Sequence, residues 1–145
     1  SHVRQAFDEL ARLPSCRLLT PSALYRTAPG GRLDQPDFIN AVAKIETTLT
    51  PHSLLKALLE VEYSHGRVRE YPNAPRTLDL DILMYDDLQC DEPGLILPHP
   101  RMHQRAFVLQ PLLEVAPDCL IPGRGAVIEL LADCRGQQVK QEQNK

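Results

Sequence analysis

The chain has 145 residues, of which 43% are hydrophobic and 24% are charged, and its formal net charge is −3 at pH 7. These values are typical of one globular domain, and the negative charge argues against nucleic acid or an acidic membrane as a partner. No apolar run approaches the roughly 18 residues of a membrane span, and the four cysteines form no CxxC pair, so we expect a cytoplasmic protein with reduced thiols.

Hydrophobic periodicity predicts two helices and two strands in the first half of the chain. Pro14 ends the first helix, and Pro21 interrupts the first strand. Thr50 is the predicted N-cap of the second helix, and Gly66 ends it. In chain order, the predicted elements are a helix at 1–14, a strand at 16–27, a strand at 37–49 and a helix at 51–65.

The second half of the chain alternates between short strands and helices. Its last eleven residues are polar, and we expect them to be frayed. The whole order of elements favours an α+β fold with an antiparallel or mixed sheet and helices on its faces. In chain order, these elements are a strand at 78–84, a strand at 95–98, a turn at 99–104, a helix at 105–116 and a helix near 126–133.

Two aspartates lie inside the predicted strand at 78–84, which otherwise looks buried. Successive residues of a strand point to opposite faces, so Asp79 and Asp81 share a face and lie roughly 7 Å apart. At that distance two carboxylates repel by about 2 kcal/mol when the effective dielectric constant is 20. We therefore expect a cation between them.

Basic side chains flank this carboxylate pair on both sides of the sequence. Arginine binds phosphate oxygens through a planar pair of donors, and paired carboxylates suit Mg²⁺. The pattern indicates a site for a metal-bound polyphosphate and transfer of a phosphoryl or pyrophosphoryl group. The basic residues are Arg67, Arg69 and Arg76 upstream, and His99, Arg101, His103 and Arg105 downstream.

Simpler interpretations of these residues exist. A D-x-D pair on a strand often faces solvent, and the arginines could pair with the aspartates. His99 and His103 have the spacing of a zinc site, but neighbouring prolines disfavour a regular helix and no third ligand is evident. A glutamate at the end of an apolar helical stripe, such as Glu62, is more often a residue that reaches water than a functional acid. Neither glycine-rich nucleotide motif, G-x-x-x-x-G-K-[ST] or G-x-G-x-x-G, occurs.

The segments "GRVREYPNAPRTLDLDILMY" and "LILPHPRMHQRAFVLQPL" closely resemble the 6-hydroxymethyl-7,8-dihydropterin pyrophosphokinases of folate biosynthesis, and "SALYRTAP" and "DQPDFINAV" match earlier segments in order. The resemblance implies transfer of pyrophosphate from ATP to the pterin hydroxymethyl group, with release of AMP. It also implies a single ferredoxin-like α+β domain over residues 1–145, with a polar tail from about 132. Such a domain works as a monomer or weak dimer with small-molecule substrates only.

The resemblance also assigns roles to individual residues. It implies that Asp79 and Asp81 bind two Mg²⁺ ions, and that Arg67 and Arg76 act catalytically on the ATP phosphates. The further ATP-binding residues that it implies are Arg69, His99, His103 and Arg105. The pterin-binding residues that it implies are Thr27, Phe38, Asn40 and Phe107, with the two phenylalanines on either face of the ring.

Two departures from the family pattern keep other functions open. The family begins with a strand and a G-S-N-L-like turn before the first helix, and this chain begins at Ser1 without them, so we expect a shortened or processed chain. The loop before Arg76 has Pro72 and Ala74 where relatives often have a basic residue and glycine. The alternatives are a decayed, non-catalytic nucleotide-binding module and a metal-dependent phosphodiesterase that uses Asp79, Asp81 and Glu62.

Overall fold

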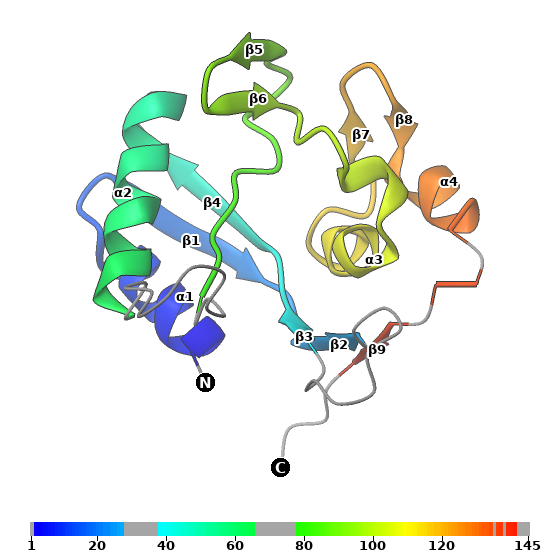
Figure 1. Ribbon diagram of the computed structural model, residues 1–145, viewed down its shortest axis with the longest axis horizontal. Coiled ribbons are helices and arrows are strands. Elements are labelled where there is room, and N and C mark those ends of the chain that lie inside the picture. The colour runs from blue at the N-terminus through cyan, green and yellow to red at the C-terminus, as the bar shows by residue number, and fades with distance from the viewer. Residues whose placement is uncertain (1, 28–37, 66–77, 135, 138, 142–145) are drawn as a thin grey trace, which may run out of the picture.

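The computed structural model describes residues 2–27, 38–65, 78–134, 136–137 and 139–141. Figure 1 shows two groups of helices with strands between them. In chain order, the elements are α1 (His2–Arg12), β1 (Cys16–Pro21), β2 (Tyr25–Thr27), β3 (Phe38–Asn40), β4 (Ala43–Thr47), α2 (Pro51–Ser64), β5 (Cys90–Glu92), β6 (Leu95–Leu97), the 3₁₀ helix η1 (Met102–Gln104), α3 (Ala106–Val115), β7 (Leu120–Ile121), β8 (Gly125–Ala126), α4 (Val127–Ala132) and β9 (Lys140–Gln141).

Helices α1 and α2 cover one face of the β1–β4 pair. The two strands are antiparallel, and their register shifts between Leu18 and Thr20. Leu10 of α1 and Leu58 of α2 are buried in the cluster that packs on these strands. The predicted start of α2 is confirmed, because the Thr50 hydroxyl accepts a hydrogen bond from the backbone N–H of Ser53 at 3.2 Å.

Helices α3 and α4 form a second core, which lies beside the end of β1 and the start of β4 (Figure 1). Leu109 and Val127 are fully buried there, and so is Met102 of η1, which precedes both in the sequence. Val42, which precedes β4, packs against the same cluster. The molecule combines helices with small antiparallel sheets, and the predicted α+β class is confirmed. No described helix has the length and apolar character needed to span a membrane.

The prediction of a regular strand at 78–84 is wrong. Residues 78–85 belong to no β-ladder, because two of their backbone groups bind elsewhere. The N–H of Leu80 donates to a carboxylate oxygen of Glu62, and the C=O of Leu83 accepts from the N–H of His99. The segment passes between the two cores (Figure 1), and Leu80 packs toward α1 and α2 whereas Leu83 packs toward α3.

Other boundaries also differ from the predictions. The predicted strand at 37–49 is divided into β3 and β4, because β3 pairs with β2 whereas β4 pairs with β1. The prediction of a frayed tail is wrong for residues 136–137 and 139–141. Strand β9 pairs with β2 and places Lys140 opposite Arg26, and Val139 packs against the α3–α4 core.

Candidate active site

Asp79 and Asp81 are both exposed, whereas Leu78 between α1 and α2 is buried. Leu80 also contacts that core. The alternation that the sequence predicted is therefore present without a β-ladder: Leu78 and Leu80 pack into the core, whereas Asp79 and Asp81 are exposed.

Glu62 anchors the segment that carries these carboxylates. Its side chain is only 3% exposed, and one carboxylate oxygen accepts the hydrogen bond from the N–H of Leu80 at 2.5 Å. The expectation that Glu62 reaches water is therefore wrong. Among the residues that the structure describes, no three His, Cys, Asp or Glu side chains gather as a metal site, so Glu62 does not join Asp79 and Asp81 in a three-carboxylate centre.

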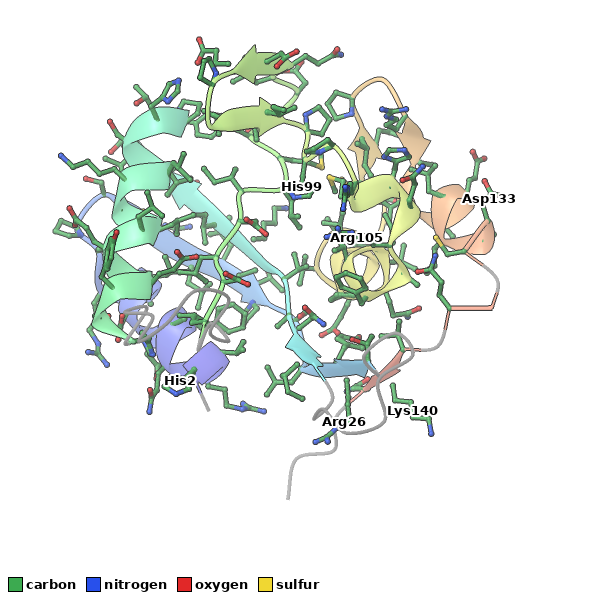
Figure 2. All side chains as sticks on the ribbon, viewed as in Figure 1. His2, Arg26, His99, Arg105, Asp133 and Lys140 are labelled. Carbon is green, nitrogen blue, oxygen red and sulfur yellow. The ribbon has the colours of Figure 1, made fainter. Side chains whose placement is uncertain are left out.

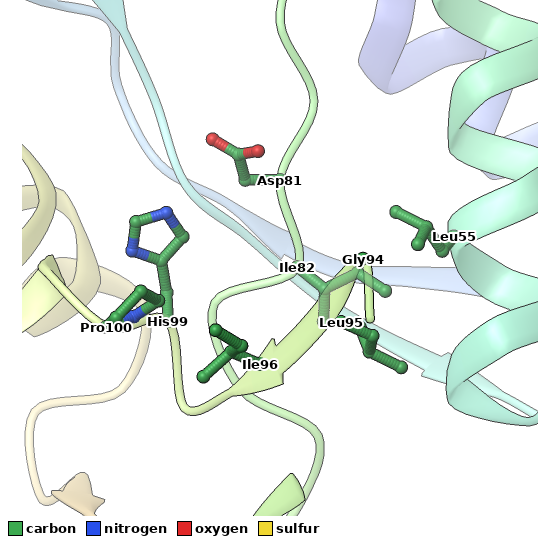
Figure 3. A pocket seen from close by; sticks show the side chains of 8 residues that line it. All are labelled: Leu55, Asp81, Ile82, Gly94, Leu95, Ile96, His99 and Pro100. Carbon is green, nitrogen blue, oxygen red and sulfur yellow. The ribbon is translucent and has the colours of Figure 1, made fainter. Parts of the chain in front are cut away.

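His99 lies near Asp81, and the two side chains line the same pocket (Figure 3). Its Nδ1 accepts a hydrogen bond from the backbone N–H of Arg101 at 3.2 Å. Burial lowers the pKa of His99, and although Asp81 acts in the opposite direction, Arg105 and Arg101 lower it further. Neutral His99 therefore carries its proton on Nε2, the ring nitrogen nearer to Asp81 (Figure 3).

Arg105 lies close to His99 in the middle of the molecule (Figure 2). It is the N-cap residue of α3, and its guanidinium lies 5.4 Å from the centre of the Phe107 ring. This distance is within the range of a cation–π contact. The structure thus brings Asp81, His99, Arg101 and Arg105 into one electrostatic neighbourhood.

An open pocket of about 250 Å³ adjoins this neighbourhood (Figure 3). Asp81 and His99 supply its polar groups, and its apolar wall comes from α2, the segment after Asp81 and the β5–β6 hairpin. The sequence did not predict this wall, because apolar residues in strands and helices resemble core positions. In the structure Ile96 is 46% exposed between two buried leucines, and no local pattern in the sequence indicates that exposure. The apolar wall consists of Leu55, Ile82, Gly94, Leu95 and Ile96.

The predicted pterin-binding residues of the first half meet on the β2–β3 pair. Thr27 lies opposite Phe38 in the antiparallel register, and the Asn40 side-chain amide donates to the Thr27 hydroxyl at 3.4 Å. Thr27 and Asn40 are both half-buried. The Phe38 side chain is not among the parts of the chain that the structure describes.

Glu114 joins β2 to α3, the helix that carries Phe107. The buried Tyr25 hydroxyl donates to Glu114 Oε1 at 2.5 Å, and the backbone N–H of Ala23 donates to Oε2 at 3.0 Å. Burial and the Glu114 carboxylate raise the pKa of Tyr25 to about 12. These bonds fix the strand of Thr27 against α3, although no local pattern in the sequence indicates them.

The remaining predicted ATP-binding residues are His103 and the three arginines upstream of Asp79. His103 is half-buried, and burial followed by the charge of Arg124 lowers its pKa. It thus lies beside the β7–β8 turn. Arg67, Arg69 and Arg76 lie outside the described residues, so their predicted roles stay predictions.

The donor chemistry of Asp79 and Asp81 fits Mg²⁺. Magnesium prefers carboxylate oxygens and commonly takes only one or two from the protein, with waters and substrate phosphates as its other ligands. Two exposed carboxylates separated by one residue, with His99 and Arg105 near Asp81, supply such donors and leave room for a phosphate.

Comparisons with known proteins agree with this chemistry. Residues 1–117 match the family model described as 7,8-dihydro-6-hydroxymethylpterin-pyrophosphokinase. The chain is 47% identical over 132 residues to the 2-amino-4-hydroxy-6-hydroxymethyldihydropteridine pyrophosphokinase of Pseudomonas aeruginosa, an alignment that covers 91% of this chain and 82% of the relative. It is 47% identical over 127 residues to the protein of that name from Methylorubrum extorquens (88% and 80% covered) and 44% identical over 126 residues to that of Haemophilus influenzae (87% and 79%).

Proposed function

Since the chain belongs to the 7,8-dihydro-6-hydroxymethylpterin-pyrophosphokinase family and is thus an enzyme of folate biosynthesis, we propose that it transfers pyrophosphate from ATP to 6-hydroxymethyl-7,8-dihydropterin. The hydroxymethyl oxygen attacks the β-phosphorus of ATP and loses its proton. The bond between the β-phosphorus and the bridging oxygen to the α-phosphate breaks, so AMP leaves and the pterin diphosphate forms. The proposed partners are these small molecules, and the proposed working form is a monomer or weak dimer.

The observation that carries this proposal is that Asp81 and His99 line one pocket, with the charge of Arg105 acting on His99 and the exposed Asp79 two residues before Asp81. Asp79 and Asp81 would hold two Mg²⁺ ions, which neutralise phosphate charge when bound. Arg105 places a permanent positive charge at the same place, and neutral His99 offers an N–H donor. Arg67, Arg69 and Arg76 are proposed to contact the phosphates as well, with Arg67 and Arg76 in catalytic roles, and His103 is retained as a weaker candidate for ATP binding.

The apolar wall of the pocket supports a site for the nucleotide base. Leu55, Ile82 and Ile96 surround a space open on one side, and flat heterocycles bind between apolar side chains. Because Asp81 and His99 line the same pocket, a base here would direct its phosphates toward the proposed metal site.

The proposed pterin site lies between β2–β3 and α3. Thr27 and Asn40 can hydrogen-bond the rim of a pterin, and Phe107 with Phe38 can stack on its faces. Glu114 holds β2 against α3, so both sides of this site belong to one packed unit. The guanidinium of Arg105 lies 5.4 Å from the ring centre of Phe107, and this proximity supports phosphate binding by Arg105 next to the proposed pterin site.

The identity of the nucleotide product tests this function. Incubation with Mg²⁺, ATP and hydroxymethyl-dihydropterin should give AMP and pterin diphosphate in equal amounts, as measured by chromatography. ADP as the product would contradict pyrophosphate transfer. Tight ATP binding without turnover would instead support the non-catalytic module. Hydrolysis of a phosphodiester would support the phosphodiesterase. The structure disfavours that second alternative, because Glu62 is buried whereas Asp79 and Asp81 are exposed.

A further inference from the structure

Gln137, in the C-terminal segment, binds two neighbouring peptide groups of the α3 start. Its side-chain Oε1 accepts from the N–H of Ala106 at 2.9 Å, and its Nε2 donates to the C=O of Gln104 at 2.9 Å. One of these peptide groups precedes Arg105 and the other follows it. A single amide side chain therefore bridges the backbone on both sides of Arg105.

This bridge meets a need that local residues leave open. The first N–H groups of a helix have no partner within the helix, and side chains at the N-cap commonly supply one. Arg105 is the N-cap residue of α3 and makes no such bond. Ala106 is only 3% exposed, so its N–H would otherwise be poorly satisfied, and Gln137 provides the acceptor from 31 positions along the chain.

The bridge also constrains the backbone of Arg105. Arg105 has φ −120° and ψ 108°, an extended conformation between a 3₁₀ helix and an α-helix. Bonds to the peptide groups on either side restrict both of these angles. The direction in which the guanidinium leaves the backbone, toward His99 and over Phe107, depends on them.

Two further contacts hold the segment that carries Gln137. Val139 packs against the α3–α4 core, and Lys140 and Gln141 pair with β2 (Figure 1). The same segment thus touches the helix of Phe107 and the strand of Thr27. It lies beyond residue 117, where the match to the family model ends, so the contact is a feature of this chain beyond the matched region.

We propose that Gln137 is a positioning residue that holds Arg105 in the orientation needed to bind the nucleotide phosphates. The inference rests on the proposed function, since the phosphates are those of ATP. Gln137 touches no substrate in this account and acts only through Arg105.

Binding of Mg²⁺ with a non-hydrolysable ATP analogue, measured by calorimetry on the full chain, tests the proposal. Gln137→Ala should raise the Kd about 5- to 10-fold, as expected for two lost hydrogen bonds. Gln104→Ala is the matched control, because it removes an exposed amide side chain and keeps the C=O that Gln137 binds; it should stay within about twofold. An unchanged Kd in Gln137→Ala would overturn the proposal.

The variant Gln137→Glu tests whether both hydrogen bonds of Gln137 matter or only the one that caps α3. A carboxylate still accepts from Ala106 and suits a helix N-terminus, but it repels the C=O of Gln104. The proposal predicts that Gln137→Glu binds the analogue as weakly as Gln137→Ala. Binding equal to that of the unaltered protein would show that only the cap matters and would overturn the bridge.

A double-mutant cycle tests whether Gln137 acts through Arg105. In an Arg105→Ala background, Gln137→Ala should not weaken binding further, whereas a purely structural effect would weaken it by the same factor in both backgrounds. Amide hydrogen exchange of Ala106 should also accelerate in Gln137→Ala, and unchanged exchange would contradict the bridge. If the unaltered protein forms no AMP, the proposed function is wrong. The exchange rate of the Ala106 amide still tests whether Gln137 bridges the two peptide groups beside Arg105.

Discussion

The nucleotide side and the pterin side of the proposed site are built differently. Asp79, Asp81, His99 and Arg105 lie on stretches without β-ladders, and buried or distant side chains hold those stretches in place. Thr27 and Asn40 instead belong to paired strands, and their register brings them together. The comparison indicates that changes to the anchors Glu62 and Gln137 should affect the nucleotide side more than the pterin side.

The largest expected effect comes from the carboxylates of the nucleotide side. Asp79→Asn and Asp81→Asn should each lower AMP formation by about a thousand-fold, since the loss of a metal ligand removes several kcal/mol of charge stabilisation. Asp87→Asn, in the exposed turn after the same segment, is the control and should be near normal. Full activity in the first two variants, with circular dichroism unchanged, would remove the metal role.

The next effect concerns the anchor of that segment. Glu62→Ala should lower the free energy of unfolding by about 2–3 kcal/mol, because the charge-assisted bond to the Leu80 N–H is lost within a buried site. Urea denaturation measures this change. Glu60→Ala, at an exposed position of the same helix, should change stability by less than about 0.5 kcal/mol, and equal losses in both variants would refute the anchoring role.

A smaller effect is expected on the pterin side. Phe107→Leu keeps an apolar side chain but removes the aromatic face, so KM for the pterin should rise about tenfold while KM for ATP changes less. Steady-state kinetics with each substrate varied in turn separates the two. Ile128→Ala, at an exposed site on α4, serves as the control. A larger rise in KM for ATP than for the pterin would place Phe107 on the nucleotide side.

The smallest effect is a pH dependence of stability at the link between β2 and α3. The Tyr25 hydroxyl ionises near pH 10 in the unfolded chain, and its pKa in the fold is about 12. Its contribution to stability is therefore complete below pH 10 and is lost as the pH rises toward 12. Tyr25→Phe should reduce the fall in stability between pH 9 and 11, measured by urea denaturation, whereas Tyr63→Phe, at an exposed position, should not.

The sequence predicted the helices well, because their apolar periodicity and caps are local features. Thr50 followed by Pro51 marked the start of α2, and the structure agrees. The strand at 78–84 was predicted from alternation alone, and alternation does indicate which side chains are buried. It cannot reveal where backbone groups bind, and Glu62, eighteen positions away from Leu80, takes one of them.

The candidate site shows the same limit. The types and spacing of Asp79, Asp81 and the basic residues indicated phosphate chemistry before any geometry was known. The apolar wall with Leu55 and Ile96 was missed, because an apolar side chain has the same pattern in a core and in a pocket. Contacts such as those of Gln137 depend on long-range packing that no local pattern encodes.

The proposed function depends most directly on Mg²⁺ joining the nucleotide to Asp79 and Asp81. A calorimetric titration of a non-hydrolysable ATP analogue, with Mg²⁺ and then with EDTA, should show binding only with Mg²⁺, and hydroxymethyl-dihydropterin should bind more tightly once the analogue is present. Nucleotide binding of equal strength without Mg²⁺, or undiminished in Asp81→Asn, would contradict it.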